Sequence, residues 1–453
     1  MPTERVTLSG ELARYACDAR LEDFPPAAQH EALRAILNWA GCAVGGSRHP
    51  AIERALAALM PFSAGPACSL LGRIERVDAL HAALLNGMSA HVLDFDDTHL
   101  RTLLHPSVPV ASALLALAER SPMAGRAFVL AFLVGVEIES RIANAIWRGH
   151  NAHWYITGTA GVFGAAAAAA VALGLDHAAT VHALGLASAQ SAGTREMAGT
   201  MAKCFIHGRA AQNGMLAALL AQQGFTAAET SLEGPHGFLQ VMVEQHDIAA
   251  ITAGLGTAFE MLSNSYKPYA CGVVAHPVID ACIQLRNAHP GIADRIARIA
   301  LTVSPRALEL TGIKSPPNGL KSKWSVYHSA AVALVDGVAG EHQYTDARVN
   351  DVQVRALRER SEAVADAALS EVAARVAVTL ADGTILERRV ERVIGSAENP
   401  MSDRDLEDKV RGLAHGILPD EKIKALIAGC WTLHDYEDMA AFARQATVAK
   451  GSS

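Results

Sequence analysis

The segment TAGVFGAAAAAAVALGL, residues 159–175, decides what kind of fold this chain can form. It contains no charged side chain, but alanine and glycine make it less hydrophobic than a membrane-spanning helix needs to be. Alanine has the highest helix propensity of all residues, and its small side chain lets neighbouring helices approach closely. The segment therefore predicts a buried helix inside a large helical core.

The helical pattern continues on both sides of this segment, up to about residue 265. Apolar residues recur with helical spacing in several further segments, at 24–46, 78–95, 108–120, 125–146, 178–190 and 208–224. Two later segments differ, because 295–305 ends in an alternating β-branched run and 372–390 contains two alternating runs around Asp382-Gly383. An Asp-Gly pair between alternating runs favours a β-hairpin. Helical spacing returns after residue 402.

This layout predicts a mainly α protein with two domains, as expected for a chain of 453 residues. We expect a large all-helical domain over residues 1–266, to which residues 405–453 return. A smaller α+β lid domain over residues 267–404 would then cover it.

The composition limits the possible partners and the cellular compartment. The net charge is −7, from 39 basic and 46 acidic side chains, without a long basic run, so nucleic acid is not an expected partner. The seven cysteines include no C-x-x-C pair, which favours a reducing environment. Residues 1–20 contain no apolar run typical of a secretory signal. We therefore expect a cytoplasmic protein that does not bind membranes.

Polar residues are concentrated in HVLDFDDTHLRTLLHPSVP, residues 91–109, which invites three chemical interpretations. A phosphatase-type D-x-D-x-T nucleophile is disfavoured, because the preceding segment is helical and Asp97 replaces the usual glycine. A metal site lacks an H-x-x-x-H or E-x-x-H pair. Acid/base chemistry without a metal remains, beside a purely structural role in which Asp96 and Asp97 cap a helix that begins near Thr98.

Further segments occur in the order and with the content typical of the MmgE/PrpD family. The sequence resembles that family in ALLNGMSAHVLDFDDTH (83–99), KCFIHGRAAQNG (203–214), KPYACGVVAHPVIDA (267–281), KWSVYHSAAVALVDG (323–337) and NPMSDRDLEDKV (399–410). Members include 2-methylcitrate dehydratase, cis-aconitate decarboxylase and iminodisuccinate epimerase. The resemblance implies a homodimer, a small polycarboxylate substrate, and no required metal or organic cofactor.

The resemblance also implies the site residues. Four are candidates for the chemistry: Lys203, His105, Asp94 and Tyr327. Five more are candidates for substrate binding: Thr98, Lys267, His153, His276 and His99. Within this set we expect histidine to move a proton, lysine to hold carboxylates or act as a base when desolvated, and Asp94 to orient a histidine.

The sequence departs from the family pattern at three positions. His153 lies about two residues upstream of the place where members carry a histidine before G-x-F-G. Cys271-Gly272 replaces a histidine of the decarboxylase-like members, which leaves His276 as a possible substitute. His99 stands where dehydratases and decarboxylases often carry tryptophan.

These departures favour one function over the others. We expect an acid/base enzyme that abstracts an α-proton from a small di- or tricarboxylate, and an epimerase of the iminodisuccinate type is slightly favoured. The alternatives are a lyase similar to 2-methylcitrate dehydratase or cis-aconitate decarboxylase, and an inactive relative that only binds its ligand.

Overall fold

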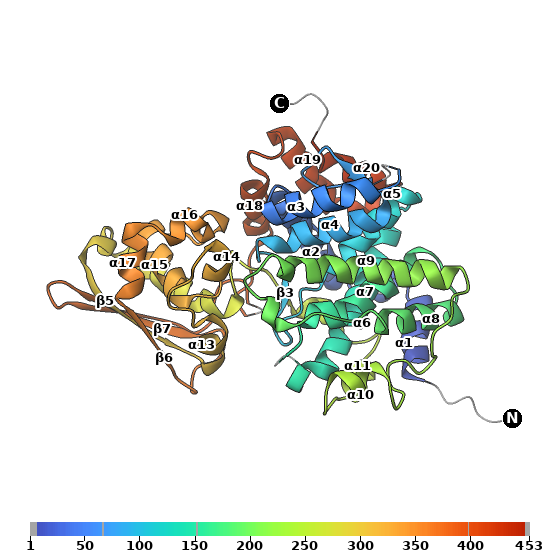
Figure 1. The fold of residues 1–453 in the computed structure, drawn as a ribbon, viewed down its shortest axis with the longest axis horizontal. Coiled ribbons are helices and arrows are strands. Elements are labelled where there is room, and N and C mark those ends of the chain that lie inside the picture. The colour runs from blue at the N-terminus through green and yellow to red at the C-terminus, as the bar shows by residue number, and fades with distance from the viewer. Residues whose placement is uncertain (1–6, 66–67, 151–152, 397, 449–453) are drawn as a thin grey trace.

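The computed structural model describes residues 7–65, 68–150, 153–396 and 398–448 (Figure 1). The fold is mainly α with a small sheet region, as the sequence predicts. A larger part, here called the helical body, contains α1 (Leu8–Asp18), α2 (Pro26–Gly46), α3 (Pro50–Leu59), α4 (Ala79–Val92), α5 (Ser107–Arg120), α6 (Gly125–His150), α7 (Ile156–Ala172), α8 (His177–Ser188), α9 (Ala202–Gln222), α10 (Phe238–Met242), α11 (Ala249–Thr252), α18 (Asp403–Ala414), α19 (Asp420–Trp431) and α20 (Met439–Gln445).

Helix α7 lies at the centre of the helical body, packed against α6, α8, α9 and α5. Every residue from 156 to 170 is buried, which confirms the predicted buried helix. None of the helices in the described ranges combines the length and hydrophobicity that crossing a bilayer requires. The alanine-rich segment is therefore a packing element of the core.

Two glycines let α4 and α9 cross almost in backbone contact. A Cβ atom on Gly208 would lie 2.3 Å from the Leu84 carbonyl oxygen, and one on Gly87 would lie 2.8 Å from the Gly208 Cα. Side chains at either position would force the helices apart. This crossing brings the C-terminal end of α4 beside the N-terminal half of α9, where polar residues gather.

A second group of helices and strands forms a separate part, here called the small lobe, on the left of Figure 1. Its sheet has the order β6-β5-β7-β8, in which β5 pairs parallel to β6 and antiparallel to β7. The predicted hairpin is confirmed as β7 and β8, with Gly383 at a φ of 86° in the turn. The strands are β5 (Ile296–Val303), β6 (Ser361–Ala365), β7 (Ala374–Leu380) and β8 (Ile385–Val390), and the helices are α12 (His276–Ala288), α13 (Pro305–Thr311), α14 (Gly319–Ser322), α15 (Val326–Asp336), α16 (Asp346–Val349) and α17 (Val352–Glu359).

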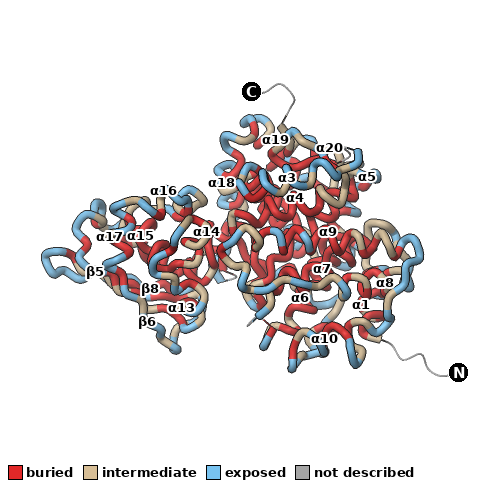
Figure 2. Tube along the Cα trace, in the orientation of Figure 1, coloured by how far each residue is buried: buried red, intermediate tan, exposed pale blue. Residues whose placement is uncertain are grey.

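The two parts have separate hydrophobic cores, which appear in Figure 2 as two regions of buried chain. One short ladder near their junction pairs β3 (Thr98–His99) with β4 (Asn264–Ser265), while β1 (Cys68–Ser69) and β2 (Arg76–Val77) form another at the edge of the body. The β3–β4 ladder ties the aspartate-rich loop to the segment that leads into the small lobe. Because the segment continues directly from β4, Lys267 is carried to the same loop.

Candidate active site

The loop between α4 and α5 carries the aspartate-rich motif in a constrained conformation. Among the described residues, Asp94 and Leu103 are the only non-glycine residues with positive φ, at 54° and 58°. Both line the same pocket at the junction of the helical body and the small lobe. Such backbone conformations persist where surrounding contacts hold them, and they are concentrated at functional sites.

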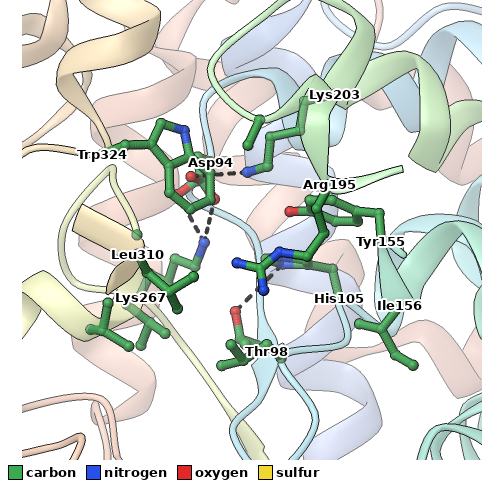
Figure 3. Close-up of a pocket in the computed structure, with 15 residues that line it drawn as sticks. Asp94, Thr98, His105, Tyr155, Ile156, Arg195, Lys203, Lys267, Leu310 and Trp324 are labelled. Carbon is green, nitrogen blue, oxygen red and sulfur yellow. Dashed lines mark hydrogen bonds and ion pairs between the residues drawn. The ribbon is translucent and has the colours of Figure 1, made fainter. Parts of the chain in front are cut away.

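Asp94 is held between two lysines that come from distant parts of the chain. Its Oδ2 lies 3.0 Å from the Lys203 Nζ on α9, and its Oδ1 lies 2.5 Å from the Lys267 Nζ after β4 (Figure 3). Burial alone would raise the pKa of Asp94, but the two ammonium groups more than offset this and hold it well below its ordinary value. Two cations share one carboxylate, so this buried cluster retains an excess of positive charge.

His105 has a defined tautomer in this pocket. Its Nδ1 lies 2.9 Å from the Asp97 carbonyl oxygen and 3.2 Å from the Asp96 Oδ2. A carbonyl oxygen can only accept a hydrogen bond, and the same holds for the Asp96 carboxylate when it is ionised. Nδ1 therefore carries the proton, and Nε2 is left as the basic nitrogen. Burial raises the pKa of Asp96, but His105 and His91 outweigh it and hold the pKa well below its ordinary value. Asp96, and not Asp94 as expected, therefore orients the histidine.

Behind His105 lies a buried histidine pair that could suggest a metal site. The ligand atoms of His91, His105 and His207 lie within 4.8 Å of one another. However, the rings of His91 and His207 stack with centroids 3.3 Å apart and planes at 15°. Histidine nitrogens bind metals along directions in the ring plane, and the planes of stacked rings run side by side instead of converging on one ion. The arrangement does not fit a shared metal ligand set.

The histidine pair instead links the elements that carry the residues of the site. His91 Nδ1 lies 2.8 Å from the Asp96 Oδ2, and His207 Nδ1 donates to the Lys203 carbonyl oxygen at 2.9 Å. Burial lowers the pKa of His91 to about 3 and that of His207 well below its ordinary value. Both rings are therefore neutral near pH 7, and they link α4, α9 and the motif loop.

Asp97 has a structural role, but not the one considered from sequence. Its Oδ2 accepts hydrogen bonds from Ser107 Oγ at 2.5 Å and Asn264 Nδ2 at 2.8 Å. No helix begins near Thr98, because that residue starts β3 and the next helix starts at Ser107. The helix-cap interpretation is therefore wrong, and Asp97 joins the loop to α5 and β4. Burial raises the pKa of Asp97 to about 6.

The pocket brings together five of the nine residues singled out from sequence: Asp94, Thr98, His105, Lys203 and Lys267. Three further polar or aromatic residues line it as well, namely Tyr155, Arg195 and Trp324 (Figure 3). Tyr155 is the residue before α7, and burial raises its pKa, so that its hydroxyl stays protonated. Trp324 lies with its ring centroid 5.0 Å from the Lys203 Nζ.

Two of the four other predicted residues lie outside the pocket, although a residue two or three positions away from each lines it. His153 is exposed, and Tyr155 occupies the pocket position instead; the upstream shift of His153 was the signal in the sequence. The Tyr327 ring lies 5.7 Å from the Lys314 Nζ and does not line the pocket, whereas Trp324, three residues earlier, does. Arg195 carried no motif by which sequence reasoning could have found it.

The other two predicted residues are held by structural contacts. His99 lies 2.8 Å from Thr102 Oγ1 through Nδ1 and 3.1 Å from Glu260 Oε2 through Nε2. His276 Nε2 lies 3.3 Å from the Cys271 carbonyl oxygen, and burial lowers the pKa of this histidine to about 3. Neither His99 nor His276 lines the pocket that holds His105.

Comparison with known proteins gives a consistent picture over most of the chain. Cis-aconitate decarboxylase from Aspergillus terreus is 27% identical over 450 residues, covering 92% of this chain and 91% of the relative. Cis-aconitate decarboxylase from Homo sapiens is 28% identical over 395 residues, covering 83% and 81%, and that from Mus musculus is 27% identical over 414 residues, covering 86% and 83%. These relatives support a lyase and give no support to the epimerase favoured from sequence.

The family assignment rests on both halves of the chain. Residues 10–250 match the MmgE/PrpD N-terminal domain, and residues 269–445 match the MmgE/PrpD C-terminal domain. The pocket described above lies where residues from both matched regions meet. The chain belongs to the MmgE/PrpD family.

Proposed function

We propose that this chain is a lyase that removes carbon dioxide or water from a small di- or tricarboxylate, with His105 moving the proton. The observation that carries the proposal is the placement of His105 in one pocket with Lys203, Lys267 and Arg195. The names of the relatives support decarboxylation in particular.

The charge of the pocket suits a polyanion. Three cationic side chains line it against one carboxylate, that of Asp94. A fourth cation, Lys323, is buried beside a smaller cavity that also borders Asp94 and Lys203. Lys203 and Lys267 share the single carboxylate of Asp94, so a carboxylate of the substrate would add the negative charge that this cluster lacks.

The proposed chemistry needs one positioned proton carrier. In decarboxylation, the bond from the α-carbon to the departing carboxylate breaks, and its electron pair stays on carbon. Protonated His105 then donates its Nε2 proton to that carbon, while Nδ1 remains bonded to the Asp97 carbonyl. In dehydration, neutral His105 takes the α-proton and hydroxide leaves from the neighbouring carbon. Lysine and arginine stabilise the charge on the remaining carboxylates in either case.

An epimerase would need proton carriers on both faces of the same carbon. The small lobe contributes Gly272, Val273, Val274, Leu310 and Trp324 to the pocket, and none of these side chains titrates in the physiological range. The small lobe therefore adds no acid/base group to the pocket, and the support for the lyase over the epimerase comes from the relatives.

The proposal can be tested by incubating the protein with cis-aconitate, citrate, 2-methylcitrate and iminodisuccinate in D₂O and following each by NMR. We expect loss of carbon dioxide or water from one of them, with deuterium at the protonated carbon when the reaction is a decarboxylation. Stereochemical inversion with exchange and no bond cleavage would restore the epimerase. Binding without reaction or exchange across the panel would favour the inactive binding protein.

A further inference from the structure

Asp94 follows α4 in a backbone conformation that the end of a helix usually gives to glycine. Leu93 is the C-cap of α4, and Asp94, the next residue, has a φ of 54°. Many helices end with one residue in this left-handed conformation, and glycine is preferred there because it has no Cβ to clash. Aspartate adopts the conformation more readily than most residues, but at a cost. Surrounding contacts therefore have to hold the Asp94 backbone in place.

Three lysines from separate parts of the chain bind three successive backbone carbonyls at this turn. The donor and acceptor pairs are Lys323 Nζ to the Leu93 oxygen at 2.6 Å, Lys267 Nζ to the Asp94 oxygen at 3.1 Å, and Lys409 Nζ to the Phe95 oxygen at 2.6 Å. Lys323 comes directly after α14 in the small lobe, and Lys409 belongs to α18 in the helical body. An ammonium group has three donors and no acceptor, so one lysine can bind several carbonyls at once.

Two of these lysines also tie the turn to the segment after β4. Lys323 Nζ donates to the Ala270 carbonyl oxygen at 2.6 Å, and Lys409 Nζ donates to the Lys267 carbonyl oxygen at 2.9 Å. The third partner of Lys409 is Asn38 Oδ1 on α2, at 2.7 Å. The turn that carries the shared carboxylate is thus fastened to the segment that carries one of its two lysine partners.

Lys409 does this from outside the pocket that holds His105. It lines neither that pocket nor the smaller cavity beside Asp94 and Lys203. It borders instead a groove lined by residues of both α18 and the small lobe, where its Nζ lies 4.0 Å from the centroid of the Phe95 ring. An effect of Lys409 on a bound substrate therefore passes through its contacts with the chain or through its charge at a distance.

We propose that Lys323 and Lys409 are positioning residues, which hold the backbone on either side of Asp94 so that its carboxylate stays between Lys203 and Lys267 (Figure 3). This rests on the proposed function, in which Lys203 and Lys267 bind carboxylates of the substrate. When the turn relaxes, the Asp94 carboxylate leaves its 3.0 Å contact with Lys203, and the two lysines lose the group that fixes their separation. The loss affects substrate binding, and therefore KM, more than it affects proton transfer.

The test uses Lys409→Met, because Lys323 borders the smaller cavity and its charge acts there directly. Hydrogen exchange followed by mass spectrometry should show faster exchange of residues 93–98 in this variant, with α7 unchanged. Steady-state kinetics on the substrate found in the panel should show KM raised about tenfold and kcat changed by less than about twofold, as expected when binding groups are misplaced.

Lys422→Met is the matched control. Lys422 lies on α19 and its Nζ also bridges two backbone carbonyls, those of Arg444 and Thr447, neither of which lines the pocket. This variant should leave the exchange of residues 93–98 and the KM at their wild-type values. Lys323→Met is the second test variant, and it should speed exchange of residues 93–98 as Lys409→Met does. It carries the exchange test by itself if Lys409→Met does not fold.

The outcomes separate this proposal from the function on which it rests. If no panel member reacts but residues 93–98 exchange faster in the two test variants alone, the hold on the Asp94 turn stands and the lyase fails. If their exchange is unchanged while KM rises, the effect is one of charge and the positioning role is wrong. If kcat falls at constant KM and α7 exchanges faster as well, Lys409 stabilises the whole fold and the proposal is again wrong.

Discussion

The helical body and the segment after β4 form one wall of the pocket and the small lobe forms the other, and the two walls differ in how they are built as well as in their chemistry. The helical-body wall stands on the glycine crossing of α4 and α9, and its groups are buried and joined by short contacts such as the 3.0 Å pair of Lys203 and Asp94. The small-lobe wall consists of apolar side chains, and Val273, Leu310 and Trp324 among them are only partly buried. The groups that can gain or lose a proton therefore come from the helical-body wall, while the small lobe adds mostly apolar surface.

The largest effect is expected from replacing His105, the proposed proton carrier. His105→Asn keeps a polar side chain but removes the basic Nε2, so kcat should fall by about 10²-fold or more, the scale of a positioned acid or base. Steady-state kinetics on the substrate found in the panel measures it. The matched control is His153→Asn, which alters an exposed histidine that does not line the pocket and should leave kcat unchanged. Wild-type turnover of His105→Asn would remove the chemistry from this wall.

A smaller effect is expected when His105 stays but loses the contact that orients it. Asp96→Asn replaces the carboxylate that lies 3.2 Å from the His105 Nδ1 and 2.8 Å from the His91 Nδ1. We expect kcat to fall about tenfold, with little change in KM, because the histidine remains present but is less well held and less basic. The pH–rate profile is the decisive readout. Its limb for the basic group should move to lower pH, and an unmoved limb would mean that Asp96 only stabilises the fold.

Substrate binding should also depend on Lys323, through its charge. Burial lowers the pKa of Lys323 to about 8, although Asp94 acts in the opposite direction. Above that pH the positive charge of Lys323, at the smaller cavity that also borders Asp94 and Lys203, is lost, so KM for a polyanion should rise roughly three- to tenfold between pH 7 and pH 9.5. In Lys323→Met, KM should be higher at pH 7 and rise less with pH. Lys409, with a pKa also of about 8, is present in both proteins, so the difference between them isolates Lys323.

The same residue gives an independent check through stability. The folded-state pKa of Lys323 is below its unfolded value of 10.5, so the unfolded chain binds more protons between pH 8 and 10.5. The unfolding free energy of the wild type should therefore rise relative to Lys323→Met over that window, in chemical denaturation. Exposed Lys314→Met should show neither effect, and identical pH dependence in both variants would contradict the assignment.

The smallest effect is expected at Tyr327, for which the family resemblance implied a role in the chemistry. Tyr327 lies outside the pocket beside Lys314, so Tyr327→Phe should change kcat and KM by less than about twofold. Trp324→Leu, three residues earlier, is the informative comparison and should raise KM, because the indole covers the Lys203 ammonium. A large loss of kcat in Tyr327→Phe would show that the small lobe contributes to the chemistry after all.

The sequence alone determined the elements of this fold and much of the charged wall. Helical spacing, the alanine-rich segment and the Asp-Gly hairpin depend on local preferences, which are readable from neighbouring residues. Asp94, His105, Lys203 and Lys267 were identified because they stand in dense, recognisable motifs. Gly272, Val273, Val274 and Trp324 stand in the same kind of motif, but nothing in the sequence showed that these residues line the pocket.

Only the tertiary structure decided which neighbours within a motif face the pocket. Tyr155 lines it and not His153, Trp324 and not Tyr327, and Asp96 orients the histidine in place of Asp94. Each of these pairs is separated by two or three residues. A step of one residue turns a helix by about 100°, and in loops the direction follows from turns and strand pairing, so such offsets point side chains to different places. In the aspartate-rich loop those directions are fixed by the α4–α9 crossing and the β3–β4 ladder, contacts between segments that are far apart in the chain.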